Sequence, residues 1–255
     1  MKVVVCVKQV AVLGDEVEFA ADGRDVDPDY LDRALNEWDG SAAEEALRIR
    51  EATGEEGEVV VITVGDEEAE AALRRCLAMG ADRAIRVRSD GLDSRDPFTV
   101  ARALAGAIGP EGADLVLTGV QSSDSVQAAT GTALAELLGL PRVAVVTRID
   151  YDPGGHKATV NRELEGGLLD VVEVDTPALL TIQTGINEPR YASLRAIKQA
   201  EQKEIAQLDP DAGGAPAYRV RQMFAPPRGE GAEMLDGGPA EIARRIAELV
   251  RERLA

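Results

Sequence analysis

Short β-branched runs alternate with longer helical runs from the first residue to about residue 147, and this alternation limits the fold more than any other feature. The apolar runs are nearly continuous, as expected for strands buried on both faces of a parallel sheet covered by helices. The predicted strands are Lys2–Val7, Glu58–Val64, Arg83–Val87, Leu115–Thr118 and Val143–Thr147. The sequence therefore predicts an α/β fold with a Rossmann-like parallel sheet.

Capping patterns mark the helices between these strands. Short polar side chains accept hydrogen bonds from the first amides of a helix, and glycine often ends one. The predicted N-terminal caps are a Ser41/Glu44 capping box, Asp66 before a helix through Met79, and Asp96 before Pro97, and the predicted ends are Gly80 and Gly109.

The second half of the chain changes character. Alternating residues at Thr159–Glu163 and Leu169–Val174, joined across Gly166-Gly167, predict a β-hairpin at the sheet edge before a last strand at Ala178–Gln183. Beyond residue 197, the stretches Asp209–Pro216 and Pro226–Gly238 are rich in Gly and Pro, which indicates an extended arm.

The arm ends in a predicted helix over Pro239–Leu254. Four apolar residues recur on it at helical spacing, namely Ile242, Ile246, Leu249 and Val250. So small a core needs a surface to lie on. Packing on the same domain and wrapping a partner subunit are equally consistent with the composition.

The charge balance excludes several classes of protein. With 46 acidic and 28 basic residues, the net charge of −18 argues against nucleic-acid binding and against anionic membranes. No run approaches the ~20 apolar residues of a membrane span, so we expect a cytoplasmic protein without membrane insertion. Cys6 and Cys76 are predicted to be reduced core thiols.

Catalytic side chains are poorly represented. The only histidine, His156, follows Pro153-Gly154-Gly155 in a predicted turn. The dinucleotide, Walker and paired-histidine zinc motifs are absent from the sequence. We therefore expect no catalytic constellation and do not predict an enzyme.

Two loops stand out as candidate sites. Gly119–Asp124, continuing to Ala129–Gly131, joins a predicted strand to a helix, where an open α/β sheet binds phosphate. The alternative is a βα loop whose Ser123 and Asp124 serve only as turn and capping residues. Gly185–Leu194 is either a rigid recognition loop that holds Leu194 outward or a structural turn in which Glu188 and Arg190 neutralise each other.

Several segments together resemble the beta subunit of electron transfer flavoproteins. They occur in the family's order and spacing over about 200 residues, which makes the match specific. These segments are Met1–Gln9, Asn36–Asp39 with Ala43–Ala46, Ala78–Ala84, Asn161–Leu168 and Asn187–Leu194.

The resemblance implies a heterodimer with an alpha subunit that holds the redox FAD, while this chain binds AMP structurally. Such a heterodimer takes electrons from flavin dehydrogenases, for example the acyl-CoA dehydrogenases of fatty acid oxidation, and passes them to a quinone oxidoreductase. The AMP positions that carry over are Cys6, Asn36, Glu37, Trp38, Asp39, Val64, Gly119, Val120, Gln121, Ser122, Ser123, Asp124, Ser125, Val126, Gln127, Ala128, Ala129 and Thr130.

The resemblance also implies roles in partner recognition. Leu194 matches the hydrophobic anchor that dehydrogenases accept, Glu163 matches a glutamate that faces the mobile FAD domain, and Trp38 takes an aromatic position near the flavin. The remaining loop positions are Asn187, Glu188, Pro189, Arg190 and Tyr191. The predicted divisions are an AMP domain at 1–184, a recognition loop and helix at 185–204, and an arm at 205–255 that packs on the alpha subunit.

The chain departs from the family pattern in three places, one of which is Leu13, where the family often has a tyrosine near the flavin. Ser122-Ser123 and Ala128-Ala129 replace side chains that commonly contact AMP, and Gln199–Glu204 replaces a lysine-rich run. Two alternatives stay open. One is an electron-bifurcating beta subunit with a second FAD in place of AMP, and the other is a nucleotide-binding module like the universal stress proteins.

Overall fold

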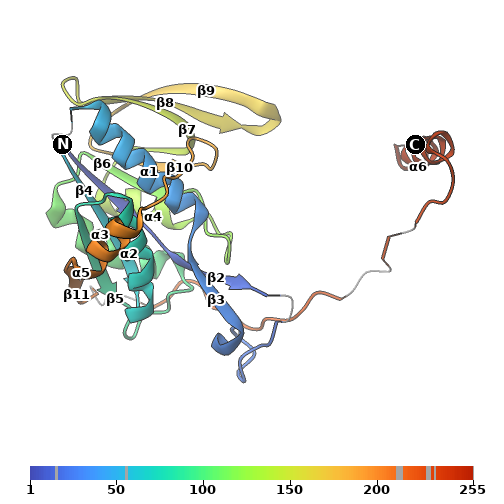
Figure 1. Ribbon diagram of the computed structural model, residues 1–255, viewed down its shortest axis with the longest axis horizontal. Helices are drawn as coiled ribbons and strands as arrows, with labels where there is room; N and C mark the ends of the chain where they lie inside the picture. Colours follow the sequence, from blue (N-terminus) through green and yellow to red (C-terminus); the bar gives the residue numbers. More distant parts are fainter. Residues whose placement is uncertain (15–16, 55–56, 211–214, 228–230, 233, 255) are drawn as a thin grey trace. The chain divides into compact units, whose positions relative to one another are not determined.

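A mostly parallel sheet forms the centre of the computed structural model, which describes residues 1–14, 17–54, 57–210, 215–227, 231–232 and 234–254. Within these residues the sheet has nine strands in the order β11-β5-β4-β1-β6-β10-β7-β8-β9 (Figure 1). The strands are β1 (Lys2–Cys6), β4 (Glu58–Gly65), β5 (Arg83–Arg88), β6 (Leu115–Gly119), β7 (Arg142–Asp152), β8 (Lys157–Leu164), β9 (Leu168–Asp175), β10 (Ala178–Ile182) and β11 (Ile205–Leu208). The predicted α/β fold and its five N-terminal strands are confirmed.

Helices cover both faces of this sheet. One apolar core lies between the sheet and the helices α1 (Glu37–Ala52) and α2 (Glu70–Met79), and the other lies beneath α3 (Pro97–Ile108) and α4 (Thr130–Leu138). Alternate residues of β1 contribute to the two cores, because successive strand side chains point to opposite faces. This two-sided burial explains why the strands are apolar at nearly every position.

Most of the predicted helix ends are confirmed. The Asp66 and Asp96 side chains accept hydrogen bonds from first-turn amides, and Gly80 ends α2 with a φ of 130°. The Ser41/Glu44 capping box is wrong. Helix α1 begins earlier, at Glu37, with Asn36 as its N-cap. Glu44 lies inside this helix, where its buried carboxylate pairs with Arg48 and Arg190.

The hairpin of β8 and β9 is confirmed at one edge of the sheet, and Gly166 and Gly167 both adopt positive φ at its turn. Strand β7 is longer than predicted, since it continues to Asp152 to pair with β8 in antiparallel register. An exposed turn with His156 joins these two strands, as predicted.

Two elements escaped prediction. Strands β2 (Gln9–Leu13) and β3 (Leu31–Leu35) form a separate antiparallel pair. Residues 205–208, predicted to begin the arm, instead form β11, which pairs in parallel with β5 at the other sheet edge. Only Ile205 of β11 is buried, so its sequence lacks the apolar pattern of a central strand.

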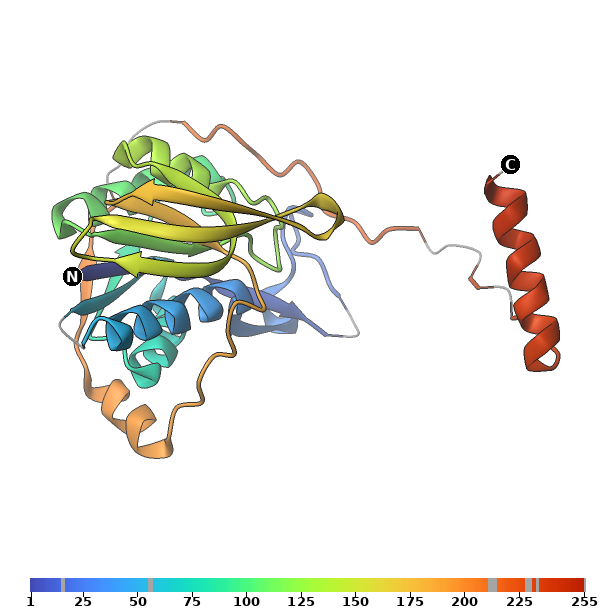
Figure 2. The same cartoon turned by 90° about the horizontal axis from the view of Figure 1, so that it is seen from above.

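The chain divides into two compact parts, Met1–Gln222 and Met223–Ala255. In the first part, α5 (Leu194–Gln202) lies beside α2, and Arg74 joins them by donating to the carbonyls of Ala200 and Lys203 (Figure 2). The Ala217 amide donates to Asp96, so the chain after β11 returns to the start of α3.

The second part contains helix α6 (Pro239–Leu254), which confirms the predicted terminal helix. The predicted Gly/Pro-rich segments Asp209–Pro216 and Pro226–Gly238 lie partly outside the described residues. Among the helices that the structure describes, none combines the length and hydropathy that a bilayer crossing requires.

Candidate nucleotide and docking sites

The candidate nucleotide site lies where the topology of the sheet reverses. Strands β1 and β6 are parallel neighbours, but the chain leaves β1 toward α1 on one face and leaves β6 toward α4 on the other. Such a switch point opens a crevice at the carboxyl ends of the strands. Cys6 and Gly119 end β1 and β6, the predicted positions Asn36–Asp39 at the start of α1 are hydrogen-bonded to residues that follow or end these strands, and Val64 lies near the same end of β4.

The carboxylate of Asp39 joins the two strand ends. Its Oδ2 accepts from the Lys8 amide at 2.8 Å, and its Oδ1 accepts from the Gly119 amide at 2.9 Å. Asp39 is only 6% exposed. Burial raises the pKa of this carboxyl to about 7, although the amides of Lys8 and Gly119 oppose the shift.

Gly119 is required by this close approach. A Cβ at this position would lie 2.5 Å from Asp39 Oδ1 and 2.6 Å from Trp38 Cβ. Both contacts are far shorter than ordinary van der Waals separations. The start of α1 therefore packs directly against the end of β6.

Asn36 holds the loop that follows β6. Its Nδ2 donates to the carbonyl of Gln121 at 2.8 Å, and its Oδ1 accepts from the Ser123 amide at 3.2 Å. Buried at the N-cap of α1, Asn36 thus makes no side-chain cap for its own helix. Its side chain serves the loop Gly119–Ala129 instead.

Lys8 is a site residue that the sequence reasoning missed. Its Nζ lies 2.6 Å from Asp124 Oδ1 and 3.3 Å from Ser122 Oγ. Burial would raise the pKa of Asp124, but the charge of Lys8 and hydrogen bonds from Lys8 and Ser122 together outweigh it and hold this pKa below its ordinary value. A polar residue directly after a buried strand was the available signal.

The loop also stores backbone strain. Val126 and Ala128 adopt φ values of 51° and 50°, in the left-handed region that non-glycine residues rarely occupy. Helix α4 then begins at Thr130, and its N-cap Ala129 offers no side-chain hydrogen bond. The first amides of a helix have no intrahelical acceptor, so they are suited to an anion.

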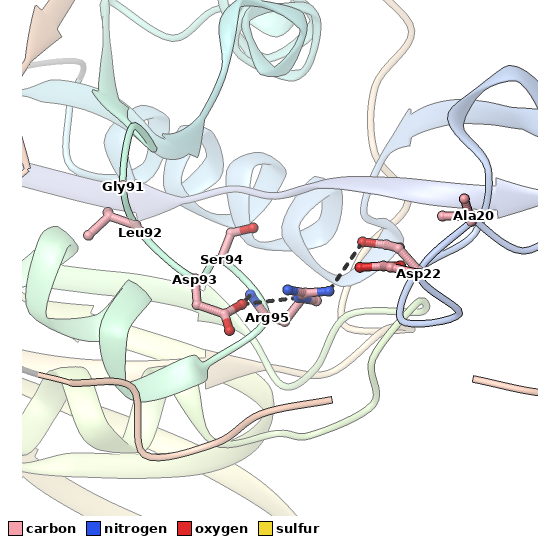
Figure 3. A pocket seen from close by; sticks show the side chains of 9 residues that line it. Ala20, Asp22, Gly91, Leu92, Asp93, Ser94 and Arg95 are labelled. Carbon is pink, nitrogen blue, oxygen red and sulfur yellow. Dashed lines mark hydrogen bonds and ion pairs between the residues drawn. The ribbon is translucent and has the colours of Figure 1, made fainter. Parts of the chain in front are cut away.

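A second hollow adjoins this loop. It is an open depression of about 630 Å³ between Ala20–Asp25, in the connection from β2 to β3, and the Gly91–Arg95 loop after β5. Arg95 points from the second loop toward the first and lies 3.1 Å from Asp93 and 3.7 Å from Asp25 (Figure 3). Gln127 Nε2 lies 3.5 Å from the carbonyl oxygen of Arg95, so Arg95, which lines the hollow, also contacts the loop Gly119–Ala129.

Trp38 belongs to a polar chain that the sequence did not predict. Its Nε1 donates to Gln183 Oε1 at 2.8 Å, and Gln183 Nε2 lies 3.5 Å from Glu163 Oε2. Glu163 is exposed and Trp38 is half-buried. The structure thus brings together two positions that the sequence analysis assigned separately to the flavin and to the FAD domain.

The recognition loop lies against α1, where Arg190 and Asn187 contact side chains of Glu44, Glu45 and Glu51. The structural-turn interpretation expected Arg190 to neutralise Glu188. Arg190 instead pairs with Glu44 and Glu51. Leu194 is 81% exposed and Tyr191 is 93% exposed. The predicted outward position of Leu194 is therefore confirmed.

A shallow groove of about 390 Å³ runs beside Leu194 on α5. Its other lining residues are Arg195, Lys198, Gln199 and Gln202. The groove is therefore edged by two cations and two amides, in a protein whose net charge is −18.

Comparison with known proteins shows the family to which the chain belongs. Residues 26–212 match the family described as "Electron transfer flavoprotein domain". The chain is 46% identical to the electron transfer flavoprotein subunit beta of Methylophilus methylotrophus, and the alignment covers 99% of this chain and 98% of the relative. The corresponding subunit of Syntrophomonas wolfei is 35% identical, with 98% and 96% covered. That of Bacillus subtilis (strain 168) is 33% identical, with 89% of each covered.

The fold and the matched region define a Rossmann-like α/β protein of the electron transfer flavoprotein class. Within that class, the similarity over whole chains is to the small subunit. The chain belongs to the electron transfer flavoprotein beta-subunit family. Membership in a family of electron carriers agrees with the prediction of a non-catalytic subunit, and the alternative of a universal-stress-like module is set aside.

Proposed function

We propose that this chain pairs with an electron transfer flavoprotein alpha subunit and that AMP occupies the crevice between β1 and β6. In this proposal the alpha subunit holds most of the FAD. The observation that carries the AMP assignment is the pair of clamps from α1, in which Asp39 joins both strand ends and Asn36 holds the following loop. They prepare a rigid loop at the position where α/β sheets bind nucleotides.

The residues present fit a nucleoside monophosphate such as AMP. Helix α4 begins without a side-chain cap at Ala129, which leaves its first amides for a phosphate group. The Asp124 carboxylate would repel that phosphate, but Lys8 Nζ lies 2.6 Å from Asp124 Oδ1 and neutralises its charge. Most of the proposed contacts are to backbone atoms, which is consistent with Ser122-Ser123 and Ala128-Ala129 in place of longer side chains.

The proposed heterodimer carries electrons from flavin dehydrogenases, such as acyl-CoA dehydrogenases, to a quinone oxidoreductase. Leu194 supports the donor side, since an exposed apolar side chain beside a groove suits transient docking. Trp38 supports the flavin side, where its ring would pack against the isoalloxazine edge. Exposed Glu163, linked to Trp38 through Gln183, would face the FAD domain of the alpha subunit.

Cofactor counting tests the proposal. The chain is co-expressed with the alpha subunit from the same genome, the complex is purified, and nucleotides are released by acid and identified by chromatography. One FAD and one AMP per heterodimer is the expected result. Two flavins and no AMP would refute the AMP assignment and favour the electron-bifurcating alternative. A colourless chain that never pairs would refute the heterodimer.

A further inference from the structure

Arg190 makes more polar contacts within the protein than any other residue of the recognition loop, among the residues that the structure describes. Its Nε donates to Glu44 Oε2 at 2.8 Å and its NH2 group donates to Glu44 Oε1 at 3.0 Å. The NH1 and NH2 groups also reach the two carboxylate oxygens of Glu51, at 2.7 and 3.2 Å. Both glutamates belong to α1, more than a hundred residues earlier in the chain.

These contacts require an arginine. A planar guanidinium can serve two carboxylates at once through paired hydrogen bonds, whereas a lysine ammonium is a point charge. Burial would raise the pKa of Glu44, but hydrogen bonds from Arg190 and Arg48 outweigh it and hold this pKa below its ordinary value. Glu44 is 3% exposed, so its charge is committed to these partners and is not available to another protein.

Further contacts fix the loop on either side of Arg190. Asn187 Nδ2 donates to the Ser41 carbonyl at 3.0 Å and to Glu45 Oε2 at 2.9 Å, again on α1. Ser193 Oγ accepts from the Ala196 amide and so caps α5, of which Leu194 is the first residue. The backbone of Leu194 is therefore held between a loop bound to α1 and a helix bound to α2.

We propose that Arg190 is a positioning residue for docking, which holds the loop on α1 so that Leu194 is presented in a fixed place. It acts through Leu194 and does not itself touch the partner. This inference rests on the proposed docking role of Leu194. Because the loop is already ordered before the partner binds, docking loses less conformational entropy. This favours a fast, transient encounter with the partner.

Hydrogen–deuterium exchange on the co-expressed heterodimer tests the positioning step without any partner. In Arg190→Gln, the amide of residue 190, which donates to Glu44 Oε2 at 3.2 Å, should exchange about tenfold faster, because opening of this segment no longer has to break the paired hydrogen bonds of the guanidinium. Arg48→Gln is the matched control, since Arg48 also pairs with Glu44 but, among the residues that the structure describes, forms no hydrogen bond or ion pair with the loop. Its loop should exchange as in the original protein. Unchanged exchange in Arg190→Gln would overturn the proposal.

Electron transfer tests the docking step. An acyl-CoA dehydrogenase from the same genome is reduced with its acyl-CoA, and the heterodimer is varied as electron acceptor. Arg190→Gln should raise the KM for the heterodimer about tenfold and leave kcat within about twofold. This pattern is expected when Leu194 is no longer held in place for docking and the electron-transfer step itself is unchanged. Added to Leu194→Ala, it should raise KM less than about twofold further, because coupled residues are not additive.

The remaining outcomes separate the two hypotheses. If the effects of Arg190→Gln and Leu194→Ala multiply, Arg190 contacts the dehydrogenase itself and the positioning role is wrong. If Leu194→Ala leaves KM unchanged while Arg190→Gln still loosens the loop, the proposed docking function fails, and the inference that rests on it fails too. Arg190→Lys keeps the charge without the fork and should show about half of the logarithmic effect, which provides a second variant should Arg190→Gln fold poorly.

Discussion

Gly119→Ala should damage both the stability of the chain and its nucleotide site. The added Cβ would lie 2.6 Å from Trp38 Cβ, which is attached directly to the backbone of α1 and cannot rotate away. It would also lie 2.5 Å from Asp39 Oδ1. Carbon atoms prefer separations of about 3.5 to 4.0 Å, so α1 or β6 must shift by roughly 1 Å.

The cost can be assembled from this geometry. Overpacking of a buried site costs about 1–3 kcal/mol, and weakening the hydrogen bond from the Gly119 amide to the Asp39 carboxylate costs about 1.5–3 kcal/mol. The φ of Gly119 lies outside the left-handed region, so alanine would restrict the unfolded chain and return about 0.4–1 kcal/mol. We expect a net loss of about 1.5–5.6 kcal/mol in the free energy of unfolding.

Urea unfolding measures this loss. Circular dichroism follows the whole fold, and the fluorescence of Trp38, the sole tryptophan, follows the altered contact. Gly109→Ala is the control, since a Cβ there meets no atom within 4 Å and the residue is already in a helical conformation. If Gly119→Ala unfolds at the same urea concentration as this control and retains its nucleotide, the close approach of α1 to β6 is not required.

Three other variants test the site and the core. Because burial raises the pKa of Asp39 to about 7, its contribution to stability is fully present below about pH 4 and is lost as pH rises to about 7; Asp39→Asn should lack this pH dependence in urea unfolding, and identical pH profiles would contradict the argument. Lys8→Met leaves Asp124 uncompensated and should weaken AMP binding about tenfold by calorimetry, while adding Asp124→Asn should restore it; failure of this rescue would show that Lys8 does not act by neutralising Asp124. Leu134→Ala in α4 should lower the free energy of unfolding by about 2–5 kcal/mol, whereas Leu137→Ala on the exposed side of the same helix should change it by less than about 0.5 kcal/mol.

Local patterns were sufficient for most of the fold. The central strands are apolar on both faces, so even single runs such as Glu58–Val64 carried a clear signal. The prediction failed for β11, whose residues other than Ile205 are exposed and show no periodicity. It also failed for the start of α1, because the buried Glu44 resembled a capping residue while its true partners were Arg48 and Arg190.

The site was harder to predict because its contacts join distant segments. Asp39 reaches Gly119 across 80 positions, and Arg190 reaches Glu44 across 146. No periodicity reports such pairs. One local signal existed for Glu44 and Glu45, which stand among alanines on a helix whose neighbouring positions are buried. Acidic residues in such a place need partners, and the nearest candidates by charge were the arginines of later loops.

Helix α1 connects the two candidate sites as one rigid element. Its N-terminal end holds the strand ends through Asp39 and presents Trp38, and its next turns hold the recognition loop through Glu44. Glu44 lies six positions after Trp38, which is about 9 Å along a helix. The helix is buried along the sheet through Ala42, Ala43, Ala46 and Leu47, so neither end can move independently. In the proposed carrier, a dehydrogenase docked at Leu194 would therefore meet a fixed distance to the flavin side of the subunit, and electron transfer would need no rearrangement within this chain.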